Sequence, residues 1–409
     1  MTIRSDDGIP PDSPGSGSAI RGVLAVGSAV ALSLFGDMGM YVILPVHYVE
    51  LGLTALQVGV LLSANRWVRL VTNHLAERLL RRLSSRILFP AALLTGSLIT
   101  GAYSIAELSA VPTFATLLVL RLVWGLCWSF IRHTGVMTTM GIAGPSRVGR
   151  LMGVYAGLVQ AGFVAGTFAA GVLFDGVGFS RTFLLAAVMS LAAVPVAVAG
   201  GRRSSVTLKD GLQDGAIPPD RASLLLSIRG FIVSLVGAGL IMSTLGYMLR
   251  NRYGETVPVG SLVLGVTTVN GALLAAQYLV NSAGSPFLGI AIDRHGIRRA
   301  QVLGFAASGA ALFALGVLGS GALFVPLVVV FFISAAISRL AVESQAALAG
   351  QRAYSGLASA TDLGSAVGPV LGWIGIELSR SGITFWAGGG LFAVGAALAL
   401  LTPRARRRA

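Results

Sequence analysis

Nine ionisable side chains lie within or beside long apolar runs of this sequence, where an isolated charge is costly. They are Asp37, Arg66, Arg69, Arg121, Arg132, His133, Arg339, Glu343 and Asp362. A charge inside a lipid bilayer usually faces a cavity or pairs with an opposite charge, so each is a candidate functional residue. An acid beside a fixed arginine has its proton affinity changed by any ligand that comes between them. These residue types therefore predict reversible ion pairing and proton binding.

Asp37 and Arg121 are the best placed of these residues to act together. Asp37 lies about 10 residues from the outer end of the apolar run 21–46, and Arg121 lies about 9 residues from the outer end of the run 112–133. At about 1.5 Å per helical residue, both would sit roughly 14 Å deep, near the middle of a bilayer. We expect a ligand or a proton to compete for Asp37, with Arg121 tuning that competition. The alternative is a permanent structural ion pair.

The residues that enzymes and metal sites need are not arranged for catalysis in this sequence. Cys127 is the only cysteine, the four histidines are scattered, and no His-Glu-x-x-His motif occurs. No Gly-rich phosphate-binding loop ending in Lys and Ser or Thr is present either. We therefore predict no enzymatic activity, no bound metal and no cofactor, with a proton gradient as the driving force.

The composition indicates a membrane protein. Of 409 residues, 55% are hydrophobic and only 11% are charged, against about a quarter in a typical soluble protein; the mean hydropathy is +0.81. Runs of this kind are long enough to cross a bilayer as helices, and twelve are expected at 21–46, 54–75, 88–106, 112–133, 151–173, 182–200, 229–249, 258–283, 301–318, 322–341, 355–376 and 382–401.

These runs predict an all-α polytopic membrane protein with a six-helix half at 20–200 and a second six-helix half at 229–402. Three segments are expected to lie outside the membrane: a disordered N-terminal tail at 1–19, a cytoplasmic linker at 201–228 and a basic C-terminal tail at 403–409. The N-terminal tail is rich in Pro, Gly and Ser and does not resemble a signal peptide.

The basic residues indicate how the chain is oriented. The net charge is +14, and most of the arginines outside the spans fall in alternate loops. The predicted outer loops hold only Arg181, Arg250, Arg252 and Arg380. Because cytoplasmic loops are enriched in Lys and Arg, both termini should be cytoplasmic. This distribution explains the charge without nucleic-acid binding, which we do not expect.

Two pairs of related segments indicate an internal repeat. "NHLAERLLRR" at 73–82 follows the second run, and "GIAIDRHGIRR" at 289–299 follows the eighth. The fifth run of each half contains "QAGFVAGT" (160–167) and "DLGSAVGP" (362–369), which share two glycines four residues apart. Such small residues let helices approach closely in lipid, so we expect helix packing at Gly162, Gly166, Gly364, Gly368 and Pro369. Two pairs in register favour duplication over chance similarity of Gly-rich helices.

On these motifs, and on "RLVWG" at 121–125, the chain resembles the major facilitator superfamily of secondary transporters over about 20–402. The second copy of the loop motif matches the family pattern through Gly289, Asp293, Arg294, Gly296, Arg298 and Arg299. The first copy departs from it, with Glu77, Arg78 and Arg82 kept but Asn73 and Leu80 in place of glycines. The resemblance implies that these loops form a cytoplasmic latch between the halves; the alternative is that they only anchor topology by positive charge.

The resemblance also implies a function and a gate. In the family the second and eleventh spans meet between the halves, so an ion pair of Asp362 with Arg66 or Arg69 is expected to form when the cytoplasmic side closes and to break when it opens. "DLGSAVGP" is similar to the Gly-Pro motif common in exporters, although that motif is usually diagnostic in the fifth span, where Thr167 stands here in place of the proline. The acid in the first span, Asp37, resembles that of drug–proton antiporters. The expected function is proton-coupled export of a small organic molecule by a monomer in a bacterial inner membrane.

Two other functions stay open. Transport of an organic anion is the first, because arginines outnumber acids within the spans, and buried positive charge attracts an anion. A non-transporting receptor, scramblase or assembly protein on the same scaffold is the second, and it would not need a titrating acid such as Asp37.

Overall fold

The computed structural model describes residues 16–80, 84–106, 113–201, 221–259, 261–318, 321–378 and 381–401. These parts of the chain are helical except for one short hairpin. In chain order the elements are α1 (Ser16–His47), α2 (Ala55–Leu80), α3 (Ser85–Ala102), η1 (Tyr103–Ile105), α4 (Thr113–Leu191), α5 (Ala193–Gly201), α6 (Arg221–Val233), η2 (Ser234–Ile241), α7 (Met242–Tyr253), β1 (Thr256–Val259), β2 (Leu262–Gly265), α8 (Val266–Ser282), α9 (Ser285–His295), α10 (Ile297–Leu318), η3 (Gly321–Leu323), α11 (Phe324–Ala349), α12 (Gln351–Glu377) and α13 (Ser381–Leu401).

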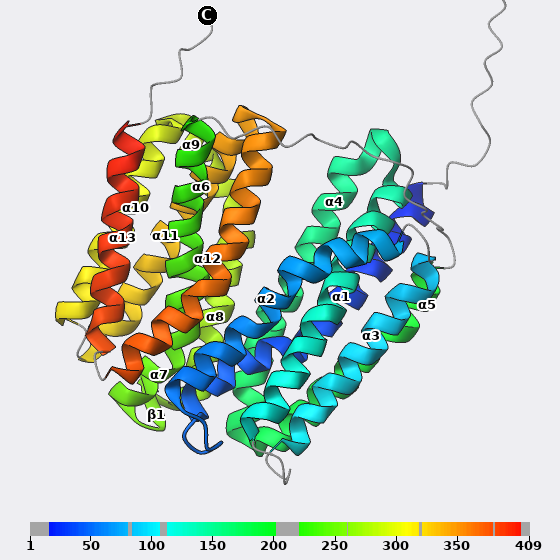
Figure 1. Cartoon of the computed structure of the whole chain (residues 1–409), viewed down its shortest axis with the longest axis horizontal. Helices are drawn as coiled ribbons and strands as arrows, with labels where there is room; N and C mark the ends of the chain where they lie inside the picture. The colour runs from blue at the N-terminus through cyan, green and yellow to red at the C-terminus, as the bar shows by residue number, and fades with distance from the viewer. Residues whose placement is uncertain are drawn as a thin grey trace, which may run out of the picture.

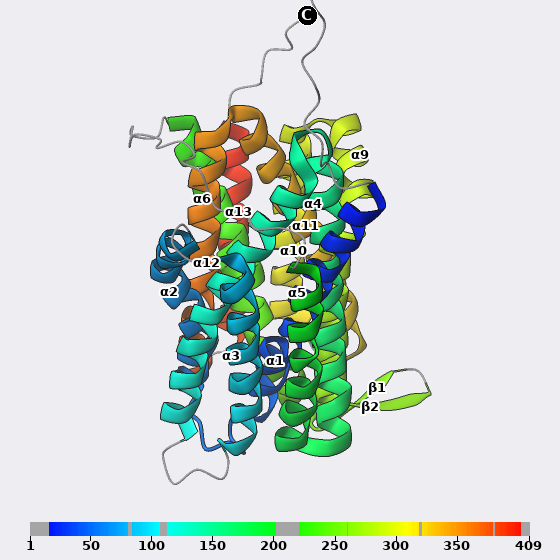
Figure 2. The same ribbon diagram turned by 90° about the vertical axis from the view of Figure 1, so that its right-hand side faces the viewer.

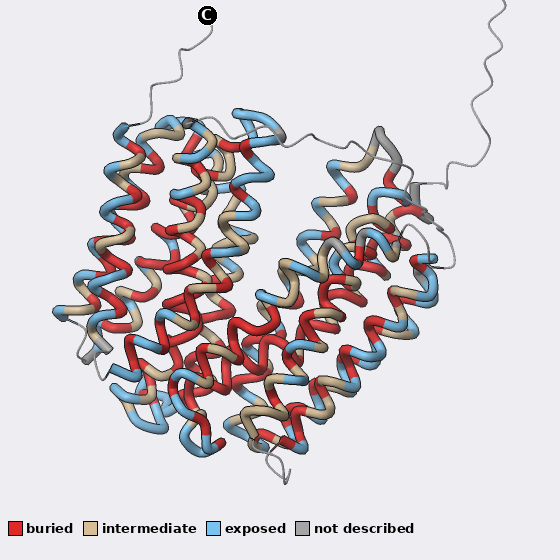
Figure 3. The backbone as a smooth tube through the Cα atoms, viewed as in Figure 1, coloured by how far each residue is buried: buried red, intermediate tan, exposed pale blue. Residues whose placement is uncertain are grey.

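The helices form two bundles, α1–α5 and α6–α13 (Figure 1). One end of the molecule carries the start of α1 and the end of α13, and is called the termini end here. The other carries β1 and β2, and is called the hairpin end; the hairpin projects there to one side (Figure 2). The bundles touch through α2 with α12 and through α4 with α8. They meet at the hairpin end and diverge toward the termini end, and buried residues concentrate where they meet (Figure 3).

The long element α4 contains three helical passes rather than one. Gly178 has φ of +79°, a conformation that a side chain disfavours, and the chain reverses there. The first pass, Thr113–Ala143, runs antiparallel to α1, since Gly135 packs on Val30 and Ile142 on Gly22. The second pass runs parallel to α1 up to this turn, since Gly162 packs on Ala31 and Gly166 on Phe35. After it the chain runs antiparallel to α1, because Phe183 packs on Gly39 while Ser190 donates a hydrogen bond to the carbonyl of Leu32 farther back along α1.

The two bundles repeat one packing arrangement. A Cβ added at Gly162 would lie 2.5 Å from Cα of Ala31, and one added at Gly364 would lie 2.6 Å from the Phe231 carbonyl oxygen. Gly368 is held in the same way, 2.4 Å from the carbonyl oxygen of Leu235. These glycines let α4 approach α1, and α12 approach α6 and η2, to a distance that no side chain would permit.

The remaining two packing candidates lie on the same helices. Gly166 is in ordinary contact with α1, since its added Cβ would be 3.4 Å from Met38. Pro369 lies inside α12, one residue after Gly368.

Eight helical segments of the described residues are long and apolar enough to cross a membrane. They are Ala19–His47, Ser85–Ile105, Thr113–Ala143, Arg147–Ala199, Ala222–Tyr253, Ile297–Leu318, Phe324–Ala349 and Gly382–Leu401. α2, α8 and α12 are outside this set. All three lie at the contact between the bundles, where the polar side chains described below pair with one another rather than face lipid.

The run expected at 258–283 is partly wrong. Residues 256–259 and 262–265 pair as an antiparallel hairpin, with Thr256 opposite Gly265, and α8 begins only at Val266. Short runs rich in valine suit a strand as well as a helix, so hydrophobicity alone did not separate them.

Two other boundaries also differ from expectation. α1 begins at Ser16, inside the predicted tail, and α6 begins at Arg221, inside the predicted linker.

Candidate functional site

An ion pair between Asp37 of α1 and Arg121 of α4 lies in the interior of the first bundle. Arg121 Nη1 donates a short hydrogen bond to Asp37 Oδ1. The side chain of Arg121 is 0% exposed and that of Asp37 is 7% exposed. Arg121 Nε also donates to the carbonyl of Leu61, at 3.2 Å, while Nη2 has no partner. The pair is therefore anchored to α2.

Asn65 of α2 completes this pair. Its Nδ2 donates to Asp37 Oδ1 at 3.3 Å, and its backbone packs against Gly125, where an added Cβ would lie 2.8 Å from the Asn65 carbonyl oxygen. Gly125 ends the "RLVWG" segment that begins at Arg121, so this segment supplies the cation and also lets α2 approach.

Tyr41 lies between two arginines. The guanidinium of Arg121 is 5.3 Å from the ring centroid and that of Arg66 is 5.2 Å from it, distances typical of cation–π contacts. The Tyr41 hydroxyl lies 3.0 Å from the Leu62 carbonyl oxygen and 3.3 Å from Asn65 Oδ1. The ring thus connects the buried ion pair to the contact between the bundles.

The bundles are joined near this point by Arg66 and Arg69. Arg69 Nη2 lies 3.6 Å from Asp362 Oδ1 of α12, so the structure brings this expected pair together. Arg66 is different: its Nη1 donates to the backbone carbonyls of Ser365 and, at 3.2 Å, Ala238. Arg66 therefore binds the second bundle through main-chain oxygens and not through Asp362, as the sequence had allowed.

Three aromatic rings from α4 and α8, those of Trp128, Phe163 and Tyr278, pack together and are called the aromatic wall here. Phe163 and Tyr278 stack with ring centroids 4.8 Å apart, and Trp128 meets Phe163 edge-on at 6.4 Å. Tyr278 belongs to α8 and the other two to α4, so this stack bridges the bundles.

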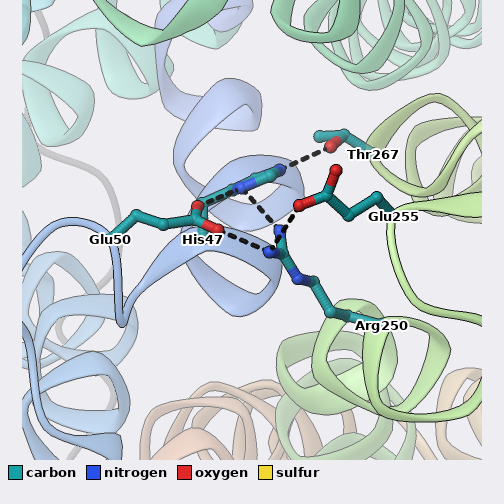
Figure 4. Close-up of polar contacts among 5 residues, drawn as sticks. All are labelled: His47, Glu50, Arg250, Glu255 and Thr267. Carbon is teal, nitrogen blue, oxygen red and sulfur yellow. Dashed lines mark hydrogen bonds and ion pairs between the residues drawn. The ribbon is translucent and has the colours of Figure 1, made fainter.

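The hairpin end is closed by a polar network (Figure 4). Arg250 Nη2 donates to Glu50 Oε1 at 2.5 Å and lies 3.4 Å from Glu255 Oε1. His47 Nε2 is 2.8 Å from Thr267 Oγ1, across the bundles. We call these five residues the hairpin-end gate.

Two further contacts seal the same end. Asp175 Oδ2 of α4 accepts a hydrogen bond from the backbone N–H of Thr268 at 2.7 Å. It thus caps α8 from the other bundle, because the first N–H groups of a helix have no partner inside it. An aromatic cluster follows the gate residue His47 in the chain: the ring centroid of Tyr48 lies 5.1 Å from that of Trp373 and 6.2 Å from that of Tyr247.

The proton on His47 decides its partner within the gate. Glu50 Oε2 makes a short contact with Nδ1, and Arg250 Nη1 lies 2.9 Å from the same atom. A carboxylate needs a protonated Nδ1, whereas an arginine needs an unprotonated one.

The second copy of the loop motif binds within its own bundle. Gly296, with φ of +88°, ends α9. Arg298 then donates to the carbonyls of Leu400 and, at 3.4 Å, Ala399, at the end of α13. The other charged members are exposed, namely Asp293, Arg294 and Arg299. In the described residues none of these has a hydrogen bond or ion pair to the first bundle, and a Cβ added at Gly289 would meet nothing within 4 Å.

The first copy is only partly described. α2 continues through Glu77 and the exposed Arg78 to Leu80, so these residues are helical rather than in a loop. The side chain of Glu77, and Arg82 altogether, lie outside the described residues.

Sequence reasoning missed Tyr41, Asn65 and the hairpin-end gate. Asn65 carried a usable signal, since it is a polar residue directly before Arg66 in an apolar run. Tyr41 and His47 carried none, because an aromatic residue or a histidine near the end of a run is common in membrane helices.

Comparisons with known proteins agree with this architecture. The sequence matches the family model described as the Major Facilitator Superfamily over residues 26–338. No curated relative matches it. The structure is similar to that of a bacterial homolog of the human lysosomal transporter Spinster, in an inward-facing and unoccupied conformation. The TM-score is 0.75 at 14% identity, covering 95% of this chain and 97% of that one.

A second similar structure is a POT family transporter in complex with 5-aminolevulinic acid, with a TM-score of 0.72 at 12% identity, covering 93% of this chain and 95% of that one. At these identities the likeness concerns the fold alone. The family match, however, covers most of the chain, and the apolar helices identify a multi-pass membrane protein. The chain therefore belongs to the Major Facilitator Superfamily of secondary transporters.

Proposed function

We propose that this protein exports a small organic molecule, a drug or a metabolite, across the bacterial inner membrane in exchange for protons. The observation that carries the proposal is the Asp37–Arg121 pair, an acid and a cation buried together beside the contact between the bundles. A buried carboxylate of this kind is a natural proton site in a transporter. Because Arg121 is anchored to Leu61 and Asn65 contacts Asp37, protonation of Asp37 alters contacts on α2 as well.

The topology that we propose has twelve spans and cytoplasmic termini. The eight apolar segments, one of which turns back at Gly178, make up this number together with α2, α8 and α12. The positive-inside rule assigns the termini end to the cytoplasm. In this orientation the hairpin-end gate closes the outer side, and the bundles separate toward the cytoplasm (Figure 1).

In this orientation the Arg69–Asp362 pair does not follow the behaviour expected from the sequence. The pair was expected to break when the cytoplasmic side opens, yet it is present while the bundles diverge beyond it. At 3.6 Å, with Asp362 37% exposed, it is a loose contact. We infer that this pair opens in response to a ligand and not to the separation of the bundles alone.

Alternating access then requires contacts to break at one end of the molecule and to form at the other. Outer opening breaks the hairpin-end gate and the Asp175 cap on α8, and cytoplasmic closure brings the latch residues at Asp293 and Arg298 toward the first bundle. Export is supported by the similarity of 362–369 to the Gly-Pro motif common in exporters, which ends here in Pro369, and antiport by the first-span acid Asp37.

The test is proton movement in liposomes. Purified protein would be reconstituted with an internal pH dye and exposed to a panel of organic cations and anions. We expect one class of compound to drive proton movement in the wild-type protein and in Asp37→Glu, which keeps the acid, but not in Asp37→Asn. Proton movement that persists in Asp37→Asn would remove Asp37 from the mechanism. No movement with any compound would favour a non-transporting role on the same scaffold.

A further inference from the structure

Three arginines near the contact between the bundles share a single carboxylate. Arg66 and Arg132 both lie close enough to Arg69 to repel its positive charge, and the carboxylate of Asp362 attracts that charge. Arg66 is bound to backbone oxygens and so has no carboxylate of its own. Within the described residues this cluster, which we call the arginine cluster, therefore holds three cations and one anion.

Such an excess of like charge beside the contact between the bundles attracts a further anion. Unpaired charges are costly in a medium of low dielectric constant, and the cost is greater for like charges held side by side. The buried pair of Asp37 with Arg121 does not supply it, since that carboxylate is already bound by Arg121 and Asn65.

The arginine cluster is open to a ligand from the termini end. Arg132 is exposed, and Arg66 and Arg69 are partly exposed. The contact of Arg69 with Asp362 is longer than a normal hydrogen bond, so a better-placed acid group can replace Asp362 there.

Facing the arginine cluster is a surface suited to an apolar molecule. Tyr278 is near enough to Arg66 to feel its charge, and it stacks on Phe163 in the aromatic wall. Behind this wall, a groove of about 570 Å³ runs along the contact of α4 with α8. It is lined by small and apolar residues that include Gly157, Val164, Phe168, Ala276 and Leu279.

The groove widens toward the termini end. At Gly271 an added Cβ would lie 2.5 Å from the Thr167 carbonyl oxygen, so α4 and α8 touch there. At Gly157, nearer the termini end of α4, nothing lies within 4 Å. α4 and α8 therefore separate along this groove toward the termini end.

We infer that the transported molecule is an amphiphilic organic anion. Its acid group binds Arg69 and Arg132 in place of Asp362, with Arg66 nearby, and its apolar body packs on Phe163 and Tyr278. This inference rests on the proposed transport function, because it names the substrate of that function.

The test is equilibrium binding to the protein in nanodiscs, with three probes. 2-Naphthalenesulfonate is an aromatic anion, 1-naphthylmethylammonium has the same ring system with a positive charge, and inorganic sulfate is an anion without an apolar body. We expect the aromatic sulfonate to bind, and the aromatic cation and the bare sulfate to bind at least tenfold more weakly. Empty nanodiscs correct for partition into lipid. Equal binding of the aromatic anion and cation, or preference for the cation, would overturn the inference.

Two substitutions give changes of opposite sign. Arg132→Gln should weaken sulfonate binding about tenfold or more, the loss expected for one charge-assisted hydrogen bond. Asp362→Asn should tighten binding, because it removes the competing carboxylate. Arg181→Gln removes an exposed arginine at the hairpin end and should leave the affinity unchanged. Weaker binding in Asp362→Asn, or no change in Arg132→Gln, would contradict the assigned site.

The outcome is separable from the test of transport, because binding is measured without a proton gradient. Sulfonate binding without proton movement would reject coupled transport and keep the anion site. Proton movement driven by cations alone would keep the transport function and reject the anion.

Discussion

The buried Asp37–Arg121 pair makes a prediction about stability that follows directly from its geometry. Asp37→Asn leaves the guanidinium of Arg121 charged and 0% exposed, with neutral partners in place of the carboxylate, among them the Leu61 carbonyl and the Tyr41 ring. Removing one partner of a buried ion pair costs about 3–5 kcal/mol, because the other charge stays buried without compensation. At about 2 °C per kcal/mol, the melting temperature should fall by roughly 6–10 °C.

The double variant separates pairing from simple loss of packing. Asp37→Asn with Arg121→Gln removes both charges, and replacing a whole buried pair is often nearly neutral. We therefore expect the double variant to melt at a higher temperature than Asp37→Asn alone. Glu255→Gln is the matched control, since its side chain is 82% exposed and its contact with Arg250 should contribute less than about 1 kcal/mol.

The assay can use the protein's own cysteine. Cys127 is the only cysteine and is buried, six residues along α4 from Arg121. A maleimide dye that fluoresces on reaction with a thiol will report unfolding as Cys127 becomes accessible. The reasoning is refuted if Asp37→Asn melts within 2 °C of wild type, or if the double variant loses the sum of the two single losses.

Two more predictions concern packing and pH. Gly162→Ala should lower the melting temperature, because its Cβ would meet Ala31 Cα at 2.5 Å and overpacking costs about 1–3 kcal/mol. Gly157→Ala is the control and should leave the melting temperature unchanged, since an added Cβ there has open space. Equal effects of the two substitutions would contradict the close packing at Gly162. A charged His47 would lie 2.9 Å from Arg250 Nη1 with its side chain only 15% exposed, so the closed hairpin-end gate favours neutral His47. The closed state is therefore fully stabilised above pH of about 6.5 and loses stability below it. Hydrogen exchange at the start of α8, corrected for intrinsic rates, should accelerate as pH falls in wild type but not in His47→Gln; a shared acceleration would exclude His47.

Much of the secondary structure could be predicted because hydrophobic length is a local property. The apolar runs that contain Asp37 and Arg121 correspond to α1 and to the first part of α4. The run at 258–283 failed because the residues before Val266 pair as two strands, with Val257 opposite Leu264, and a pairing partner is not visible in hydrophobicity.

The contacts were harder to predict than the helices. The sequence left Arg66 and Arg69 equivalent as partners of Asp362, although they are three residues apart on one helix and point to different neighbours: Arg69 to Asp362, and Arg66 to the carbonyl of Ser365. The loop motif at 289–299 was expected to act as a latch between the halves. In this structure, with the bundles apart at the termini end, Arg298 binds the end of α13 in its own bundle, and the latch stays a prediction.

The sequence by itself determined which residues are buried in lipid or protein, how deep each charge lies along its helix, and which glycines recur at equal spacing in the two halves. Depth follows from counting residues at a fixed rise, and therefore needs no knowledge of neighbours. Only the tertiary structure decided that Asn65 completes the Asp37–Arg121 pair, that Arg250 meets His47 across 203 residues, and that three arginines gather around one acid. The physical reason is that the direction in which a side chain points, and what it meets there, depend on how whole helices pack against each other.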